Sequence, residues 1–169
     1  KQGLELFYGK AKCSTCHSDA LQTDHSFHAL MLPSFGPGRT RRFEHIARDR
    51  GRINETDRLE DSYRFRTPSL RNVVASAPYG HNGAYKTLQG IIEHHLSPRK
   101  SFDSYDQSQL VMVKDAYLSK TDFIINQDKR ETARMRRYLD INLPALNSTE
   151  VSLLIKFLHS LTDSASLYG

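Results

Sequence analysis

The residues with the clearest chemistry are the two cysteines of the chain, which stand in the sequence Cys13-Ser14-Thr15-Cys16-His17. Two thiols at this spacing lie one helical turn apart, so both can form thioethers with the vinyl groups of one porphyrin. The histidine that follows directly can then bind the iron. The motif therefore predicts one covalently attached haem c, held by Cys13 and Cys16, with His17 as the proximal iron ligand.

Three other interpretations of the motif compete with haem attachment: a redox-active C-x-x-C pair, half of a zinc site, and a structural disulfide. A thioredoxin-like pair needs a βαβ context, which the sequence pattern does not provide. Zinc needs a second pair of Cys or His residues at ligand spacing. Covalent haem attachment is therefore the favoured interpretation.

A second axial ligand must come from one of the remaining histidines or methionines. The candidates are His25, His28, His45, His81, His94, His95, His159, Met31, Met112 and Met135. A ligand has to project from the apolar wall of a haem pocket, which selects among them by helical position. We predict His95, with Met112 as the reserve and Met31 after it.

The choice of His95 rests on a predicted helix that starts after Thr87 as its N-cap and ends at Pro98. At about 100° per residue, His95 shares the apolar face of this helix, whereas His94 lies about 110° from the centre of that face. A lone histidine on an apolar face is usually a hydrogen-bonded core residue. A haem that needs a ligand reverses this preference.

Two further helices are needed to hold the haem motif in place. Apolar spacing predicts a helix over residues 3–13 that runs into the motif. Asn147 is the N-cap of a second predicted helix, over residues 148–161, with a single apolar stripe. Because each stripe needs a partner, we predict that these helices cross, with Phe7 in contact with Leu154 or Leu158.

The remaining pattern predicts an all-α, cytochrome c-like helical domain with long loops. Shorter helices are expected over 107–118 and 128–139, and no convincing alternation of β type is present. Residues 39–61, which are rich in arginine and acidic residues, are predicted to form a surface excursion. A length of 169 residues favours one domain over 1–169.

Composition agrees with a bound cofactor and limits the functional classes. Hydrophobic residues make up 38% of the chain, so a large apolar cofactor would help to complete the core. No run of about 18 apolar residues is present, which excludes a membrane span. The net charge of +5 comes from arginines that alternate with acids, so nucleic acid is not a favoured partner. The chain starts without Met or a signal-peptide pattern, and we expect it to be processed or cut from a longer protein.

Three longer blocks carry a resemblance to a known family: residues 65–73 (FRTPSLRNV), 77–85 (APYGHNGAY) and 154–162 (LIKFLHSLT). With them the chain resembles the C-terminal haem domain of the bacterial di-haem cytochrome c peroxidases and their MauG-type relatives. In that family the distal ligand, Met or Tyr, lies fourteen residues after the histidine that matches His81. Here that position is His95. A His/His haem should have a lower potential than a His/Met haem, which argues against high-potential electron storage.

The resemblance has further implications for ligands and partners. It implies a Ca²⁺ ion held partly by the backbone carbonyls of Ser76 and Pro78, since loop oxygens suit calcium. It also implies a first haem domain upstream of residue 1, where peroxide would be cleaved. Arg66 and Arg71 are candidates to pair with the haem propionates, because arginine binds carboxylates bidentately.

The leading functional hypothesis is therefore an electron-relay domain of a di-haem peroxidase-type oxidoreductase. It would pass electrons between a small redox protein, such as a cytochrome c or a cupredoxin, and a catalytic haem in a second domain or chain. The alternative is a free-standing monohaem c-type electron carrier without catalytic activity. Direct peroxide cleavage at this haem is disfavoured, because two histidine ligands leave no open iron position. Covalent haem attachment implies assembly outside the cytoplasmic membrane, and the resemblance to the family implies that this is the bacterial periplasm.

Overall fold

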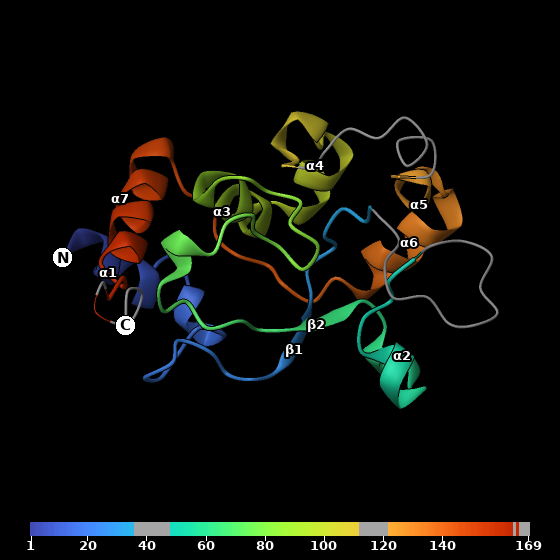
Figure 1. The fold of residues 1–169 in the computed structure, drawn as a ribbon, viewed down its shortest axis with the longest axis horizontal. Coiled ribbons are helices and arrows are strands. Elements are labelled where there is room, and N and C mark those ends of the chain that lie inside the picture. The colour runs from blue at the N-terminus through green and yellow to red at the C-terminus, as the bar shows by residue number, and fades with distance from the viewer. Residues whose placement is uncertain (36–47, 112–121, 164, 166–169) are drawn as a thin grey trace.

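The computed structural model describes residues 1–35, 48–111, 122–163 and 165, and it is largely helical, as predicted. Figure 1 shows the helices around a short two-stranded sheet. The helices are α1 (Gln2–Tyr8), α2 (Ile53–Thr56), α3 (Leu88–Leu96), α4 (Pro98–Asp103), α5 (Ile124–Gln127), α6 (Lys129–Tyr138) and α7 (Ser148–His159). Short 3₁₀ turns lie at Cys13–Thr15, Leu59–Asp61, Val73–Ala75 and Gln107–Gln109. Among the described helices, none is long and apolar enough to cross a membrane.

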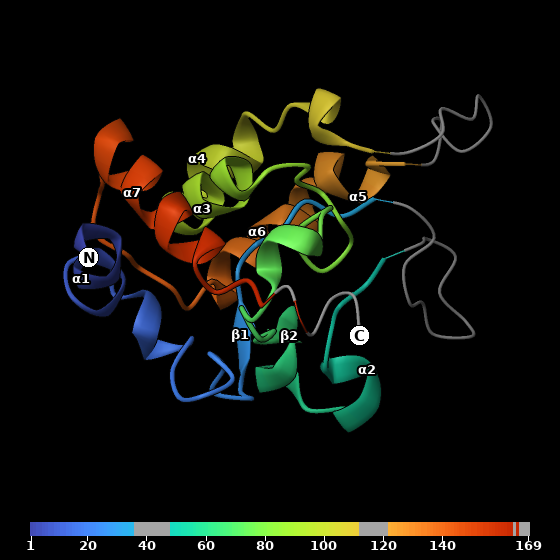
Figure 2. The ribbon, with the colours of Figure 1, turned by 60° about the vertical axis from the view of Figure 1, so that its left-hand side comes forward.

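The helices at the two ends of the described chain pack side by side, which confirms the predicted crossing (Figures 1 and 2). Phe7 of α1 shares a buried cluster with Leu154 and Leu158 of α7, and its ring centroid lies 5.0 Å from that of Phe157. Gly3 makes the close approach possible, because a Cβ atom there would lie 2.1 Å from the Leu153 carbonyl oxygen. The first helix is thereby fixed directly ahead of the haem motif.

The first helix is shorter than predicted. The expected span of 3–13 is wrong at its end, since α1 stops at Tyr8 and Gly9 forms its C-cap. Ala11 is fully buried although it lies beyond the helix, and Lys12 adopts a left-handed conformation with φ 54°. The apolar spacing therefore continued past the helix because the following turn also faces the core.

Helices α3, α6 and α7 begin where the sequence predicts them. The Thr87 side chain accepts a hydrogen bond from the Gly90 N–H, and Asn147 and Glu150 form a reciprocal capping box. Ser97 lies between α3 and α4. Pro98 is the first residue of α4, where the missing N–H of proline would have no partner within the helix in any case. The helix predicted over 107–118 can be compared with the structure only up to residue 111. The structure has a 3₁₀ turn at Gln107–Gln109 in this part, and the rest, including Met112, lies outside the described residues.

Two short strands depart from a purely helical fold. Strands β1 (Phe27–Ala29) and β2 (Arg64–Arg66) pair antiparallel, with His28 opposite Phe65. Three residues are too few to show an alternating pattern, which is why the sequence does not reveal them. This pairing joins the segment that follows the haem motif to the segment that leads into residues 67–72 (TPSLRN).

The predicted surface excursion over 39–61 is described only from residue 48 onward. That part contains α2 and is tied to α6 by the side chain of Arg48, whose Nη1 lies 2.9 Å from Oε2 of Glu131. Glu131 is 1% exposed and also accepts a hydrogen bond of 2.5 Å from the Tyr63 hydroxyl. The single-domain organisation and the excursion remain predictions.

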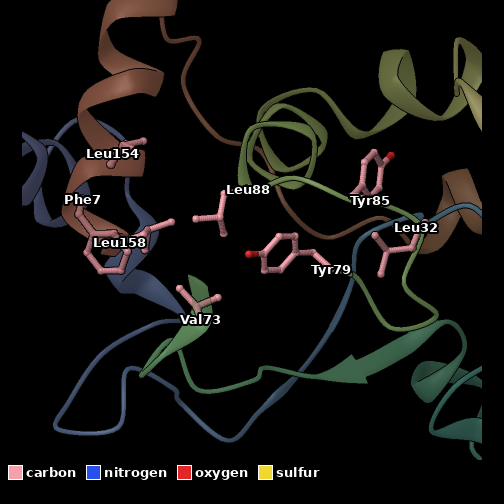
Figure 3. Close-up of a cluster of buried hydrophobic side chains, with 10 residues drawn as sticks. Phe7, Leu32, Val73, Tyr79, Tyr85, Leu88, Leu154 and Leu158 are labelled. Atoms are coloured by element: carbon pink, nitrogen blue, oxygen red, sulfur yellow. The ribbon is translucent and has the colours of Figure 1, made fainter. Parts of the chain in front are cut away.

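A core of aliphatic and aromatic side chains lies between α1, α3 and α7. Figure 3 shows Leu88 and Tyr79 pointing toward each other, with Phe7 and the leucines of α7 on one side and Tyr85 on the other. Around this core, Cys13 and the apolar side chains of Leu70, Ile91 and Ile92 are only partly buried. Apolar side chains that pack on the same core as Cys13 therefore remain partly uncovered.

Candidate haem-binding site

The cysteine motif lies in a tight turn that follows α1. The left-handed Lys12 starts the 3₁₀ turn Cys13–Thr15, and the N–H groups of Cys16 and His17 both donate to the Cys13 carbonyl, at 3.3 and 3.0 Å. This turn keeps the two thiols and the imidazole within one short segment. The local backbone thus suits attachment of both cysteines and the adjacent histidine to one group.

The chemistry of the thiols separates haem attachment from its competitors. Both cysteines are free, so the disulfide interpretation is not supported. Burial raises the pKa of Cys13 to about 11 and also raises the pKa of Cys16. A redox-active C-x-x-C needs a lowered thiol pKa, because the thiolate is the reactive form. The two thiols therefore lack the electrostatics of a disulfide oxidoreductase.

One group of metal-ligating side chains includes a motif cysteine. The ligand atoms of Cys16, Asp24 and His28 lie within 4.8 Å of one another. His28 Nε2 is hydrogen-bonded to Asp24 Oδ2 at 2.8 Å, and its Nδ1 lies 3.9 Å from Asp140 Oδ2. Zinc would need the Cys16 thiolate, which a thioether to haem consumes. The two uses of Cys16 exclude each other, and the group leaves Cys13 without a role.

The imidazoles of His17 and His95 have matching hydrogen bonds. His17 Nδ1 donates to the Gln22 carbonyl at 3.1 Å, and His95 Nδ1 donates to the Ile91 carbonyl at 2.8 Å. Since a carbonyl oxygen only accepts, each neutral ring carries its proton on Nδ1 and has its lone pair on Nε2. This is the tautomer and the supporting hydrogen bond that metal-binding histidines usually have.

The two histidines also influence each other electrostatically. Burial, together with the smaller effect of the nearby His95, lowers the pKa of His17 to about 4. Burial likewise lowers the pKa of His95. Both imidazoles are therefore neutral at neutral pH, as iron ligands must be. The structure brings together His17 and His95, which the sequence predicted as the axial pair.

The neighbouring histidine of α3 is a buried, hydrogen-bonded core residue. His94 lies away from the apolar face of the helix, and yet it has no exposed surface. Its Nε2 donates to the Leu30 carbonyl and its Nδ1 accepts from the Tyr85 hydroxyl, both at 2.8 Å. Helix α3 is therefore buried on two sides, and only one of them shows as an apolar stripe. With both nitrogens engaged, His94 has no lone pair free for a metal.

The other predicted site residues lie in exposed positions. Arg66 and Arg71 are exposed, and Arg66 Nη1 lies 3.4 Å from His25 Nδ1. Ser76 and Pro78 are exposed in the loop after the Val73–Ala75 turn. Propionate pairing by the arginines and calcium binding by the two carbonyls remain predictions.

Of the two reserve ligands, only Met31 lies within the described residues. Met31 is 2% exposed within a separate buried cluster with Tyr63, Phe102 and Met135. Met112 lies outside the described residues.

Sequence reasoning missed one contact in the family-like blocks. The His81 ring stacks on Phe65 with centroids 3.9 Å apart, and its Nε2 lies 2.9 Å from Asp49 Oδ2. The partners come from three separate segments, so no local pattern could have joined them. This contact holds the APYGHNGAY loop against β2.

The arrangement as a whole fits a c-type haem. Two cysteines in one turn, two neutral histidines and partly uncovered apolar side chains are the groups that covalent attachment and iron ligation would require. A haem iron held by both His17 and His95 would have no open ligand position, which would suit electron transfer.

The chain is similar to bacterial cytochrome-c peroxidases and to MauG proteins. The chain is 34% identical to cytochrome-c peroxidase IdrP1 of Pseudomonas sp. strain SCT, over 56% of this chain and 30% of that protein. It is 33% identical to the methylamine utilization protein MauG of Methylorubrum extorquens, over 57% of this chain and 24% of that protein. No protein-family profile matches the chain.

A solved structure supports the fold. The diheme peroxidase BthA of Burkholderia thailandensis E264 superposes with a TM-score of 0.64 and 22% identity, covering 96% of this chain and 42% of that chain. The matched region thus corresponds to about a quarter to less than half of these longer proteins. The family resemblance seen in the sequence is confirmed.

Proposed function

Because the chain is homologous to the C-terminal haem domain of the di-haem cytochrome c peroxidase and MauG family, we propose that it is an electron-relay domain carrying one haem c. The observation that carries the proposal is the pair of neighbouring neutral histidines, His17 and His95, each with Nδ1 donating to a backbone carbonyl. Such a pair gives a six-coordinate iron that exchanges electrons without an open position for peroxide.

Each residue of the site has a defined task in this proposal. Cys13 and Cys16 form the thioethers, and the bound haem then supplies a one-electron ferric/ferrous couple. His17 and His95 bind the two axial positions, and the carbonyls of Gln22 and Ile91 fix the orientation of their rings. The partly buried apolar side chains of α3 exclude water from the iron. Each of these groups therefore favours rapid transfer of one electron to or from the iron with little change in the positions of its ligands.

The partners follow from the family and from the share of each relative that the chain matches. We propose that electrons pass between a small redox protein, such as a cytochrome c or a cupredoxin, and a catalytic haem in a second domain or chain of the same enzyme. The chain matches 30% of the length of the Pseudomonas peroxidase, which leaves room for such a domain in that relative. Covalent haem attachment supports a periplasmic location. Calcium at the carbonyls of Ser76 and Pro78 belongs to the same proposal.

The proposal is tested by haem content and ligand chemistry in protein exported through a haem-attachment pathway. The denatured protein should keep its colour and a mass increment of one haem. A Cys13→Ala, Cys16→Ala double variant should lose both. Colour that is extracted by acidified organic solvent would contradict covalent attachment.

The relay role has its own test, which also separates it from the free carrier. Reduced protein should be oxidised by peroxide slowly when alone, and quickly when a peroxide-cleaving haem domain of this family is present. Equal rates in both cases would contradict the relay. Fast oxidation of the isolated chain would instead point to peroxide chemistry at this haem.

A further inference from the structure

A buried hydrogen-bond chain runs beside the proposed iron ligand. The Tyr85 hydroxyl donates to His94 Nδ1 at 2.8 Å, and His94 Nε2 donates to the Leu30 carbonyl at 2.8 Å. The Ser101 hydroxyl lies 3.0 Å from the Tyr85 oxygen and must be the donor there, since the single phenolic hydrogen points to His94. Tyr85 is 1% exposed and His94 0%, so water offers no replacement for these bonds.

This chain fastens α3 to three other parts of the molecule. Leu30 follows β1, Tyr85 lies in the loop before α3, and Ser101 belongs to α4. All three bonds meet at or next to His94, one residue before His95. The carbonyl bond of His95 lies within α3 itself, so it fixes the ring relative to the helix and not the helix relative to the pocket.

The rotation of α3 matters because an iron–nitrogen bond tolerates little displacement. The Cα atoms of an α-helix lie about 2.3 Å from its axis, and the Nε2 atom of an extended histidine lies about 7 Å away. A rotation of about 20° would therefore move Nε2 of His95 by about 2 Å, which is the length of the bond itself. Something must hold the helix against such a rotation.

We propose that His94 is a positioning residue for the distal ligand. Its two hydrogen bonds, to Leu30 and Tyr85, fix α3 so that His95 Nε2 stays within bonding reach of the iron. The proposal rests on the proposed function, because it takes His95 as the axial ligand. It predicts that His95 is lost to competing ligands more easily when the buried chain is cut.

The test uses the haem-loaded protein and the exchange of His95 for an added ligand. Imidazole is added to the ferric protein, and the rate of its binding to iron is followed by absorbance together with the reduction potential. Tyr85→Phe removes the donor to His94 and keeps the ring. His94→Gln keeps an amide donor for the Leu30 carbonyl but withdraws the acceptor from Tyr85. Each variant should raise the exchange rate about five- to tenfold, the factor that corresponds to one hydrogen bond.

A matched control separates positioning from general loss of stability. Tyr63→Phe also removes a buried phenol hydroxyl, here one that donates to Glu131 of α6 at 2.5 Å. It should lower the unfolding midpoint by a similar amount and leave imidazole exchange at the wild-type rate. Equal acceleration in Tyr63→Phe, or wild-type rates in both Tyr85→Phe and His94→Gln, would overturn the positioning role.

A further variant distinguishes failure of this proposal from failure of the proposed function. His95→Ala should bind imidazole at once, because no protein ligand has to leave. If His95→Ala exchanges like the wild type, His95 is not the ligand and the axial pair itself is wrong. If His95→Ala binds imidazole at once while the two His94-chain variants behave like the wild type, only the positioning role is wrong.

Discussion

The contact between α1 and α7 offers a sharp test of how the haem motif is held. Replacing Gly3 by alanine would place a Cβ atom 2.1 Å from the Leu153 carbonyl oxygen and 2.8 Å from Cβ of Phe157. Ordinary contacts of a Cβ atom begin at about 3.4 Å. The obstacle is backbone within a regular helix, so it cannot rotate away. Helix α1 would have to retreat from α7 by about 1 Å.

Two effects of the substitution oppose each other, and their sizes decide the sign. Alanine favours a helix over glycine by at most about 1 kcal/mol, and less in a first turn. Overpacking of a close contact costs about 1–3 kcal/mol. The retreat would also loosen Phe7 from Leu154 and Leu158, with which it forms the buried cluster. We therefore expect Gly3→Ala to lower the free energy of unfolding by about 1–2 kcal/mol.

The assay is urea unfolding of the haem-loaded protein, followed by helical circular dichroism. Gln2→Ala serves as the control, because Gln2 is exposed in the same helix and the change alters helix propensity without a clash. Its stability should match or slightly exceed that of the wild type. A Gly3→Ala protein at least as stable as the wild type would refute the close packing of α1 on α7.

Three further predictions concern ligand, charge and metal. His95→Met should keep a six-coordinate iron and raise the reduction potential, measured by potentiometric titration, because a thioether favours ferrous iron; an unchanged potential would speak against ligation by residue 95. The hydrogen bond from Lys10 lowers the pKa of Glu150, so this carboxylate stabilises the fold above its ordinary pKa and the contribution disappears as the pH falls through the lowered value. Glu150→Gln should therefore make unfolding midpoints less dependent on pH in the acid range, and an unaltered pH profile would contradict this. Removing calcium with a chelator should lower the thermal midpoint if the carbonyls of Ser76 and Pro78 bind it, and calcium should restore the midpoint whereas magnesium should not.

Much of the helical frame could be predicted because its signals are local. The capping box of Asn147 and Glu150 and the N-cap Thr87 are formed by residues within one turn of each other. The crossing of α1 and α7 followed from two apolar stripes that each needed a partner. The haem motif is equally local, since five consecutive residues contain both thiols and the proximal imidazole.

The features that escaped prediction depend on distant parts of the chain. The burial of His94 requires a carbonyl at Leu30 and a phenol at Tyr85, and neither is visible from the periodicity of α3. Likewise, α1 ends at Tyr8 because the next segment turns toward the core while keeping the apolar spacing. A periodic pattern reports which side chains are buried, and it does not report whether helix or turn buries them.

His95 was predicted as the distal ligand from two directions, but its hydrogen bond to the Ile91 carbonyl was not predicted. Helical position and the distance from His81 both selected His95. The bond from its Nδ1 to the Ile91 carbonyl depends on the side-chain rotamer, which the sequence does not specify. That bond is the feature that makes His95 a ready ligand.

The iron ligands themselves provide the most direct test of the central claim. X-ray absorption at the iron edge of the ferric, haem-loaded protein distinguishes nitrogen from sulfur ligands and gives their distances. The account predicts two axial nitrogens, from His17 and His95, at about 2 Å. A sulfur ligand would contradict it and point to Met112 in place of His95, which would restore the His/Met pattern of a high-potential haem. A five-coordinate iron would contradict it as well, because peroxide could then bind at this haem.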